Sequence, residues 1–244
     1  MRRFRHLALR CLALMSLLCA AENVVLAAKD PAKPVVVRWD EARPGCTFSR
    51  TADGKYHYGI SFDDVGITVA VDSQELEKVR HRHEPFFGVL LSVRYRGPGA
   101  LEVTAENASL EFVKHFQVVQ SSLDPDDFSA RVQNDADELD HQTAREIEKH
   151  PEQKETKEVY MRAFQKDAAE LLEFVSKNSL RPAHLSPANP EINGWVLFST
   201  RSKWIGGWKK QEEFILRLPL AEKIFEFPFR LPPKEGELIL RRRE

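Results

Sequence analysis

Cysteine is scarce in this chain of 244 residues, which excludes a disulfide-rich scaffold. Two of the three cysteines, Cys11 and Cys19, lie near the N-terminus, and the third is Cys46. If the N-terminal leader described below is removed, Cys46 has no partner within its own chain, so no intrachain disulfide can form. We expect Cys46 to be a buried thiol that packs as a small apolar side chain, with a disulfide to another chain as the alternative.

The chain also lacks the short motifs that mark common catalytic and nucleotide-binding sites. It contains no glycine-rich phosphate loop, no Gly-x-Ser-x-Gly, no His-Glu-x-x-His and no Cys-x-x-Cys. The neighbouring carboxylates Asp63 and Asp64 have the composition of a turn. Because catalytic triads are assembled from distant positions, these absences do not exclude an enzyme. They favour a protein that has no catalytic residues and no cofactor.

A long hydrophobic run is missing as well. The apolar run that follows Arg10 ends at Glu22, and it is shorter than the roughly 20 residues that cross a bilayer. A basic head, a short apolar stretch and then small residues are typical of a secretory signal peptide, which we predict over residues 1–28. Cleavage can follow Ala21, Ala27 or Ala28. We therefore expect an exported protein, periplasmic or extracellular, with no transmembrane segment after cleavage; an uncleaved amphipathic helix is the alternative.

Positive and negative charges are nearly balanced. Removal of residues 1–28 takes away four arginines and one glutamate, and so changes the net charge from −1 to −4. This weak acidity gives no reason to expect nucleic acid or an anionic membrane as a partner. The exception is Arg241-Arg242-Arg243, which we interpret as a solvated chain end. We expect a protein or another cell-envelope component as the partner, rather than a small-molecule substrate.

Two regions of the chain have the apolar spacing of β-strands, and the region between them has that of helices. Residues 29–123 and 181–244 contain β-branched and aromatic runs separated by turn residues, which predicts strands. On the longest of these runs, Phe87 and every second residue to Tyr95 mark one face, and a further strand is predicted over Leu110 to Val119. Residues 181–193, which are rich in proline and asparagine, form a connector before the last strands.

Residues 124–180 are predicted to form an inserted α-helical hairpin. Asp124 can cap the first helix and Pro125 fits its first turn, while Pro151 ends it. Apolar residues then recur every three or four positions on both helices. The predicted stripe on the first helix is Phe128, Val132, Ala136, Leu139, Thr143 and Ile147, and that on the second is Val159, Tyr160, Ala163, Phe164, Ala168, Leu171, Leu172 and Val175.

The predicted strands follow one another in a familiar order. They are Ile67 to Val71, Phe87 to Tyr95, Leu110 to Phe112, Gly194 to Phe198 and Phe214 to Leu218. This order resembles that of exported bacterial immunoglobulin-like domains of the telokin-like type, many of them of unknown function, over about half of the mature chain. The resemblance implies a mainly β protein with an immunoglobulin-like antiparallel β-sandwich, and it supplies no catalytic residues. The helical insertion departs from that pattern.

The last strands offer a candidate binding surface. Gly206-Gly207 is a plausible two-residue hairpin turn, which pairs Leu197 with Leu216 and Trp195 with Leu218 on a common core face. The tip of this hairpin would carry Trp204 and Trp208 together with Arg201, Lys203, Lys209 and Lys210. Tryptophans and cations that extend beyond the core can bind a partner. The alternative is that these tryptophans cover the end of the sandwich or pack on the helices.

A second candidate is a metal site. His81, His83 and Glu84 form a compact group, and on a strand the two histidines share a face, so they could ligate zinc or copper with His57 or His115 as a further ligand. The alternative is a solvated charged loop. We therefore predict an exported, non-enzymatic binding or structural module of the cell envelope, with a metal-binding or hydrolytic exported protein that uses His81, His83 and Glu84 as the alternative.

Overall fold

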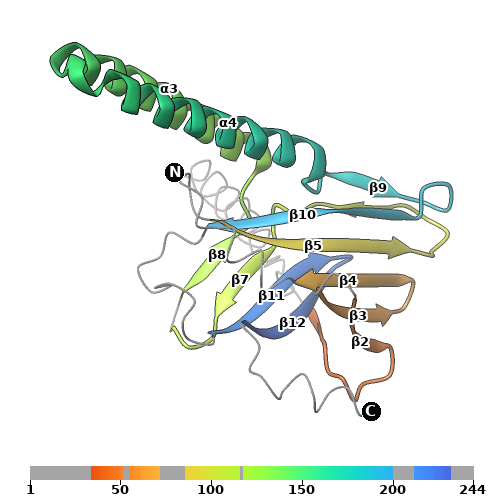
Figure 1. Ribbon diagram of the computed structural model, residues 1–244. Helices are drawn as coiled ribbons and strands as arrows, with labels where there is room; N and C mark the ends of the chain where they lie inside the picture. Colours follow the sequence, from red (N-terminus) through yellow and green to blue (C-terminus); the bar gives the residue numbers. More distant parts are fainter. Residues whose placement is uncertain (1–33, 52–54, 72–85, 116–117, 200–211, 232–244) are drawn as a thin grey trace, which may run out of the picture. The chain divides into compact units, whose positions relative to one another are not determined.

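Residues 34–51, 55–71, 86–115, 118–199 and 212–231 are described by the computed structural model of this protein. Within these ranges the fold is mainly β, with three sheets and two long helices (Figure 1). All of these elements belong to the unit that begins at Val35. The predicted mainly β fold with helices between residues 124 and 180 is confirmed.

Sheet I contains five strands in the order β10-β5-β4-β3-β2, and all its neighbouring pairs are antiparallel. The strands are β2 (Cys46–Arg50), β3 (Tyr56–Phe62), β4 (Val65–Val71), β5 (Phe86–Tyr95) and β10 (Glu191–Ser199). Successive side chains of a strand point to opposite faces, and on β5 every second residue from Phe87 to Val93 is buried, as predicted. Asp63 and Asp64 form the turn between β3 and β4, where Asp63 has a φ of 51°.

Sheet II contains five strands in the order β1-β12-β11-β7-β8. The strands are β1 (Val35–Arg38), β7 (Ser109–Phe112), β8 (Val119–Ser121), β11 (Glu212–Leu220) and β12 (Lys223–Leu231). The pair β1–β12 is parallel, which differs from the antiparallel pairing that we predicted throughout. Nearly the whole chain separates these two strands, so no short turn imposes an antiparallel pair. A small third sheet pairs β6 (Leu101–Val103) with β9 (Ala183–Leu185).

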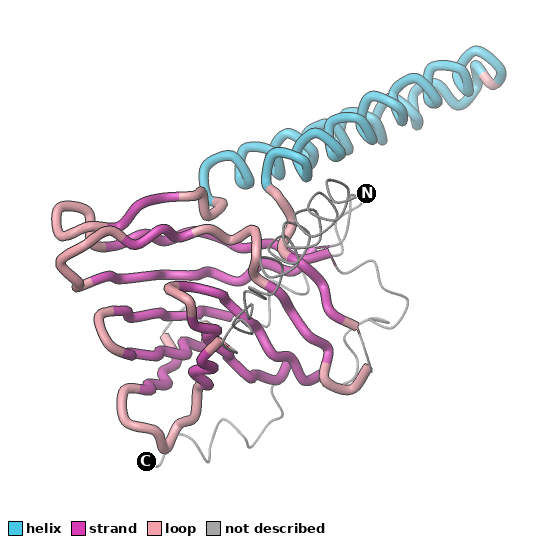
Figure 2. The backbone as a smooth tube through the Cα atoms, turned by 180° about the vertical axis from the view of Figure 1, so that it is seen from behind, coloured by secondary structure: helices cyan, strands magenta, loops and turns pink. Residues whose placement is uncertain are grey.

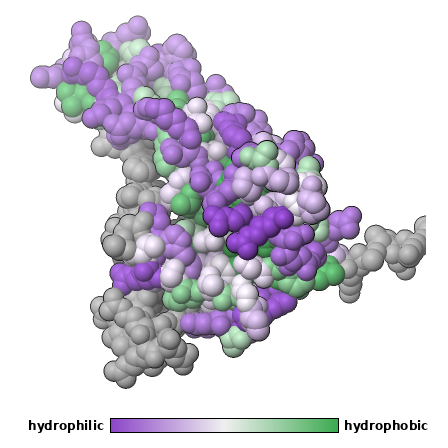
Figure 3. All heavy atoms as spheres, turned by 90° about the vertical axis from the view of Figure 1, so that its right-hand side faces the viewer, coloured by the Kyte–Doolittle hydropathy of each residue, from purple (hydrophilic) through white to green (hydrophobic). Residues whose placement is uncertain are grey.

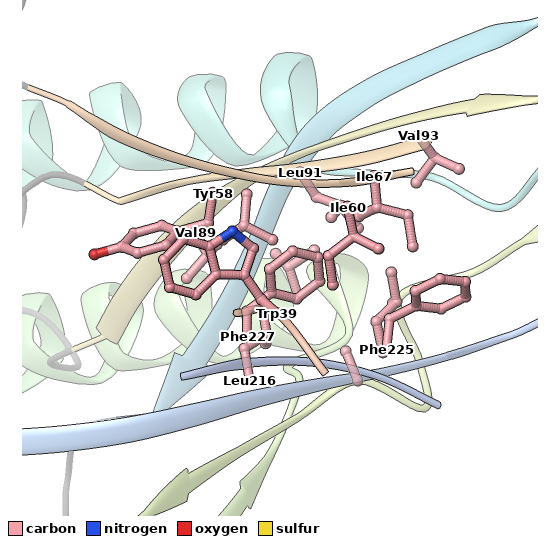
Figure 4. Packing of buried hydrophobic residues seen from close by; sticks show 14 of the residues in the cluster. Trp39, Tyr58, Ile60, Ile67, Val89, Leu91, Val93, Leu216, Phe225 and Phe227 are labelled. Atoms are coloured by element: carbon pink, nitrogen blue, oxygen red, sulfur yellow. The ribbon is translucent and has the colours of Figure 1, made fainter. Parts of the chain in front are cut away.

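Sheets I and II share one apolar core. Figure 4 shows Ile60, Ile67 and Leu91 of sheet I facing Leu216, Phe225 and Phe227 of sheet II. Each fully buried side chain of this size contributes about 1.5–3 kcal/mol. Two polar contacts join the sheets at their margins. The indole N–H of Trp39, just after β1, donates to the Thr47 carbonyl at 3.0 Å, and Lys223 pairs with Asp63 at 2.8 Å.

The helical hairpin has the boundaries that its sequence signals indicate. Helix α3 (Pro125–Lys149) begins after Asp124, whose side chain accepts hydrogen bonds from the backbone N–H groups of Asp126 and Asp127. A short 3-10 turn over Pro151–Gln153 leads into α4 (Lys154–Asn178). Figure 2 shows the two helices side by side, with the turn that joins them at the end far from the strands.

One end of the hairpin packs on the outer face of sheet I. A second apolar cluster joins residues 128–136 of α3 and residues 164–175 of α4 to Leu197 on β10. Phe86 of β5 meets the ring of Phe128 edge-on at 5.5 Å, and the rings of Phe174 and Trp195 lie 5.7 Å apart. Arg181 closes this end by pairing with Asp126 at 2.8 Å. We call residues 125–139 and 164–178 the base half of the hairpin, and residues 140–163 the far half.

The predicted hairpin between β10 and β11 is wrong. Strand β10 pairs with β5 in sheet I, with Leu197 opposite Gly88, whereas β11 pairs with β12 and β7 in sheet II, with Leu216 opposite Phe227 and Leu110. Both Leu197 and Leu216 are buried, but in different clusters. The two strands therefore belong to different sheets, and no local signal in the sequence distinguishes this arrangement from a tight turn.

Three smaller predictions also need correction. The strand predicted over Leu110 to Val119 is two strands, β7 and β8. Val159 and Tyr160, which we placed on the packed stripe of α4, are 54% and 44% exposed, and Met161 is buried in their place. The pattern around these residues fits two helical faces that differ by one position, and the packing against α3 decides between them. Cys46 is only partly buried.

Candidate functional site

The residues predicted to bind a partner or a metal lie outside the described residues. They are Arg201, Lys203, Trp204, Trp208, Lys209 and Lys210 for the tip, and His81, His83 and Glu84 for the metal. Their predicted roles therefore stay predictions. The two further ligands considered, His57 and His115, belong to different sheets, on β3 and between β7 and β8. In the described part of the chain, no group of three or more His, Cys, Asp or Glu side chains is placed to hold a metal ion.

The described residues contain a polar groove on the outer face of sheet I, with a volume of about 240 Å³. It crosses β2, β3, β4, β5 and β10 near the end where β5 stops and β10 begins. Figure 3 views the molecule from this end of Figure 1 and shows strongly hydrophilic side chains gathered on it. The outward side chains that line the groove, with the β3–β4 turn and the start of the loop after β5, are Thr47, Gly59, Ser61, Asp63, Asp64, Gly66, Thr68, Ser92, Arg94, Arg96 and Glu191.

The strand register explains why a groove forms here. From β2 to β5, one row is Thr47–Gly59–Thr68–Ser92, and all of these side chains are small. Side chains at directly opposed positions point to the same face of a sheet, so a row of small residues leaves a depression. The next row, which includes Gly66, ends in the long side chains of Arg94 and Glu191. These long side chains form one wall of the depression.

Gly66 is the position at which the groove is open. A Cβ atom built there would meet its nearest atoms, in Arg94 and Ser61, at 3.9 Å, which is ordinary van der Waals contact. Gly59 differs, because the Thr47 hydroxyl already occupies the space above it. The floor therefore contains one site that the protein leaves unfilled, in a strand where glycine gives no packing advantage.

Arg94 and Glu191 form a hydrogen-bonded ion pair on the surface. Arg94 donates to one Glu191 oxygen from both Nε and Nη2, at 3.1 and 2.6 Å, and the Ser92 hydroxyl donates to the other oxygen at 3.2 Å. The hydrogen bond from Arg94 is the main reason that the pKa of Glu191 lies below its usual value. Glu191 also lines the groove, where its carboxylate can accept hydrogen bonds.

The far half of the hairpin is a second candidate surface. No member of the apolar cluster that reaches sheet I lies between residues 140 and 163, all of which the structure describes. There the helices are held to each other, by buried Thr143 and Met161 and by a hydrogen bond from Lys157 to Glu146. That hydrogen bond is also the main reason that the pKa of Glu146 is lowered. Val159 and Tyr160 are the large apolar side chains exposed on this half.

Sheet II carries an ion-pair ladder that we interpret as structural. Glu226 is 8% exposed and accepts from Arg38 at 3.0 Å and from Arg217 at 2.8 Å, and Arg217 also pairs with Glu111. Burial opposes the charge of Arg217, but the hydrogen bonds that Arg217 donates to Glu226 and Glu111 outweigh it, so the pKa of Arg217 is raised. A buried charge needs a partner. Since the charges of this ladder already pair with one another, it offers little to a ligand.

Sequence reasoning missed the polar groove. The available signal was one small outward residue, a glycine or a residue with a hydroxyl, on each of four strands: Thr47, Gly59, Thr68 and Ser92. That signal becomes a site only when the strands lie in register, because Thr47 and Ser92 are far apart in the chain. Pairing between strands that are distant in the sequence cannot be predicted from the spacing of residues within each strand.

The comparisons with known proteins found no counterpart: neither a protein-family model, nor a curated protein, nor a solved structure matches the chain. Among the described residues, neither long helix is apolar enough to cross a membrane.

Proposed function

We propose that this protein is an exported, non-enzymatic binding module of the cell envelope, and that the far half of its helical hairpin binds a protein partner. The observation that carries the proposal is the division of the hairpin between an anchored half and an exposed half. The predicted leader over residues 1–28 supports export.

The base half supports the proposal because it fixes the direction of the hairpin. Phe128 is fully buried and Val175 likewise, and both belong to the cluster that includes Leu197 of sheet I. In proteins, most of the stability of a helix comes from packing of its apolar face. A rigid base therefore holds the far half in a defined position, which lowers the entropy lost when a partner binds.

The far half supports the proposal because of what it exposes. Val159 and Tyr160 are neighbours on a helix whose other exposed residues are mostly charged. Tyrosine is enriched among the side chains that dominate binding energy, because it combines a large apolar surface with a polar group. Across the far half, six acidic and five basic residues nearly balance each other. A suitable partner would present an apolar pocket surrounded by charged residues of both signs.

The experiment is site-specific photo-crosslinking in the intact envelope. A photoreactive phenylalanine analogue replaces Tyr160 in one strain and Lys166 in another; Lys166 lies further along α4, and its side chain is 76% exposed. We expect a discrete crosslinked protein from position 160 that is absent or much weaker from position 166. Equal crosslinking from both positions, or none from position 160 while the protein is exported, would refute the proposed binding surface.

Export itself is tested by the mass of the protein recovered from the envelope. We expect an N-terminus that follows Ala21, Ala27 or Ala28. Recovery of the intact leader on protein in the cytoplasm would contradict it.

We also propose that sheets I and II form an immunoglobulin-like sandwich of the telokin-like type. The apolar core between the two sheets supports it, as does strand β5, which ends at Tyr95 shortly before Gly97-Pro98-Gly99. An experimental structure of the mature protein would test the strand order, and a topology other than that of immunoglobulin-like domains would refute it.

A further inference from the structure

The polar groove lies on the same outer face of sheet I as the base half of the hairpin, but at the end of the sheet where β5 stops, and its lining residues differ from those that hold the hairpin. We propose that it is a binding site for a neutral oligosaccharide. This inference goes beyond the proposed function and does not depend on it.

The first argument is the charge balance of the groove. Its charged groups are the carboxylates Asp63, Asp64 and Glu191 and the guanidinium groups of Arg94 and Arg96. Lys223 of β12 pairs with Asp63 at 2.8 Å and brings a third positive charge. Three negative and three positive groups leave no net charge. An ionic ligand would be attracted by the groups of opposite charge and repelled by the groups of like charge. A neutral ligand is not penalised in this way.

The second argument is the hydrogen-bonding character of the floor. Thr47, Ser61, Thr68 and Ser92 each have a hydroxyl, and a hydroxyl can both donate and accept. The Glu191 carboxylate accepts, and the Arg94 guanidinium donates, from positions that their mutual hydrogen bonds fix. A ligand that satisfies such a surface must itself carry many groups that donate and accept. Sugar hydroxyls meet this requirement.

The third argument is the shape of the groove. Its volume of about 240 Å³ is slightly below the roughly 300–1,000 Å³ of pockets that enclose a drug-sized ligand. An open groove of this size on a sheet face accommodates one or two sugar rings and leaves the chain free to continue beyond it. No aromatic side chain lines it, so the hydroxyl and charged groups must supply the recognition.

Gly66 provides a test that separates ligand binding from folding. Gly66→Val adds three carbon atoms where the nearest protein atoms are 3.9 Å from the Cβ position, and valine is favoured over glycine in strands. The variant should fold and should fill the groove. Gly99→Val is the matched control, because it makes the same change outside the groove, where the nearest atom is the Tyr95 hydroxyl at 3.7 Å.

The experiment is saturation-transfer NMR with the full chain and four hexasaccharides. Three are neutral (cellohexaose, maltohexaose and the hexamer of N-acetylglucosamine), and hexagalacturonate is anionic. We expect saturable binding of at least one neutral probe, its loss in Gly66→Val, and its retention in Gly99→Val. Thr68→Val, which replaces a hydroxyl with a methyl group of the same shape, should weaken binding by about tenfold through the loss of a hydrogen bond.

Several results would overturn the proposal. They are the absence of binding by every neutral probe, a response to hexagalacturonate alone, and binding by Gly66→Val that equals that of the unaltered chain. If Gly66→Val fails to fold, Thr68→Val decides the question, and unchanged affinity in that variant counts against the site. Crosslinking from position 160 does not involve the groove, so failure of this proposal leaves the proposed hairpin function unaffected.

Discussion

Replacement of Phe128 by alanine tests how the hairpin is attached. The ring of Phe128 is fully buried in the cluster that joins the base half to sheet I, and it meets the Phe86 ring edge-on at 5.5 Å. Deletion of a buried phenylalanine side chain costs about 3–5 kcal/mol through lost apolar contacts and the cavity left behind. The aromatic pair accounts for roughly 0.5–1.5 kcal/mol of that loss.

The assay is urea denaturation followed by circular dichroism at a helix-sensitive wavelength. We expect Phe128→Ala to lower the free energy of unfolding by about 3–5 kcal/mol, or to separate an early helical transition from the unfolding of the sheets. Val159→Ala is the control, because Val159 is 54% exposed on the far half, and its loss should change the free energy by less than about 0.5 kcal/mol. If the two variants are equally stable, the hairpin is not held through Phe128.

Three further predictions concern the sheets. Glu226→Ala leaves Arg38 and Arg217 without their shared partner. Because both arginines are partly exposed, we expect the free energy of unfolding in chemical denaturation to fall by about 1–3 kcal/mol, which is less than the roughly 3–5 kcal/mol of a fully buried pair. An unchanged free energy of unfolding would refute the structural role of the ladder. Glu222 has a φ of 60° in the two-residue turn between β11 and β12. Glu222→Gly should therefore raise the melting temperature by relieving roughly 1 kcal/mol of backbone strain. A lower melting temperature would contradict this prediction. The pKa of Glu191 is lowered mainly by its hydrogen bond from Arg94. The contribution of Glu191 to stability is therefore present above its unfolded-state pKa and is lost as the pH falls through its folded-state pKa. Arg94→Gln should raise the folded-state pKa of Glu191 in an NMR titration, and an unchanged pKa would show that the pair does not form in solution.

Local signals predicted the helices well. Asp124, Pro125 and Pro151 act within a few residues of themselves, through a cap, a first-turn preference and a missing backbone donor. Helix α3 therefore begins and ends where these residues indicate. The inward face of β5 could be predicted equally well, because strict alternation of apolar residues over ten positions fits only a strand with one buried face.

The pairing of the strands was harder to predict from the sequence. Trp195 and Leu197 look like one core-facing set, but they face the hairpin, while Val196 and Phe198 face the core between the sheets. A strand with apolar residues on both faces gives no clue to which sheet it joins. The polar groove depends on the register of five such strands, so it could be found only once the strands had been paired.

Amide hydrogen exchange of the mature protein tests the central claim most directly. The claim is that packing on sheet I holds the base half of the hairpin and leaves the far half available to a partner. We predict slow exchange over residues 125–139 and 164–178 and markedly faster exchange over residues 140–163, because only the base half adds buried contacts with the sheet. Equal protection along both helices, or faster exchange in the base half, would contradict the claim.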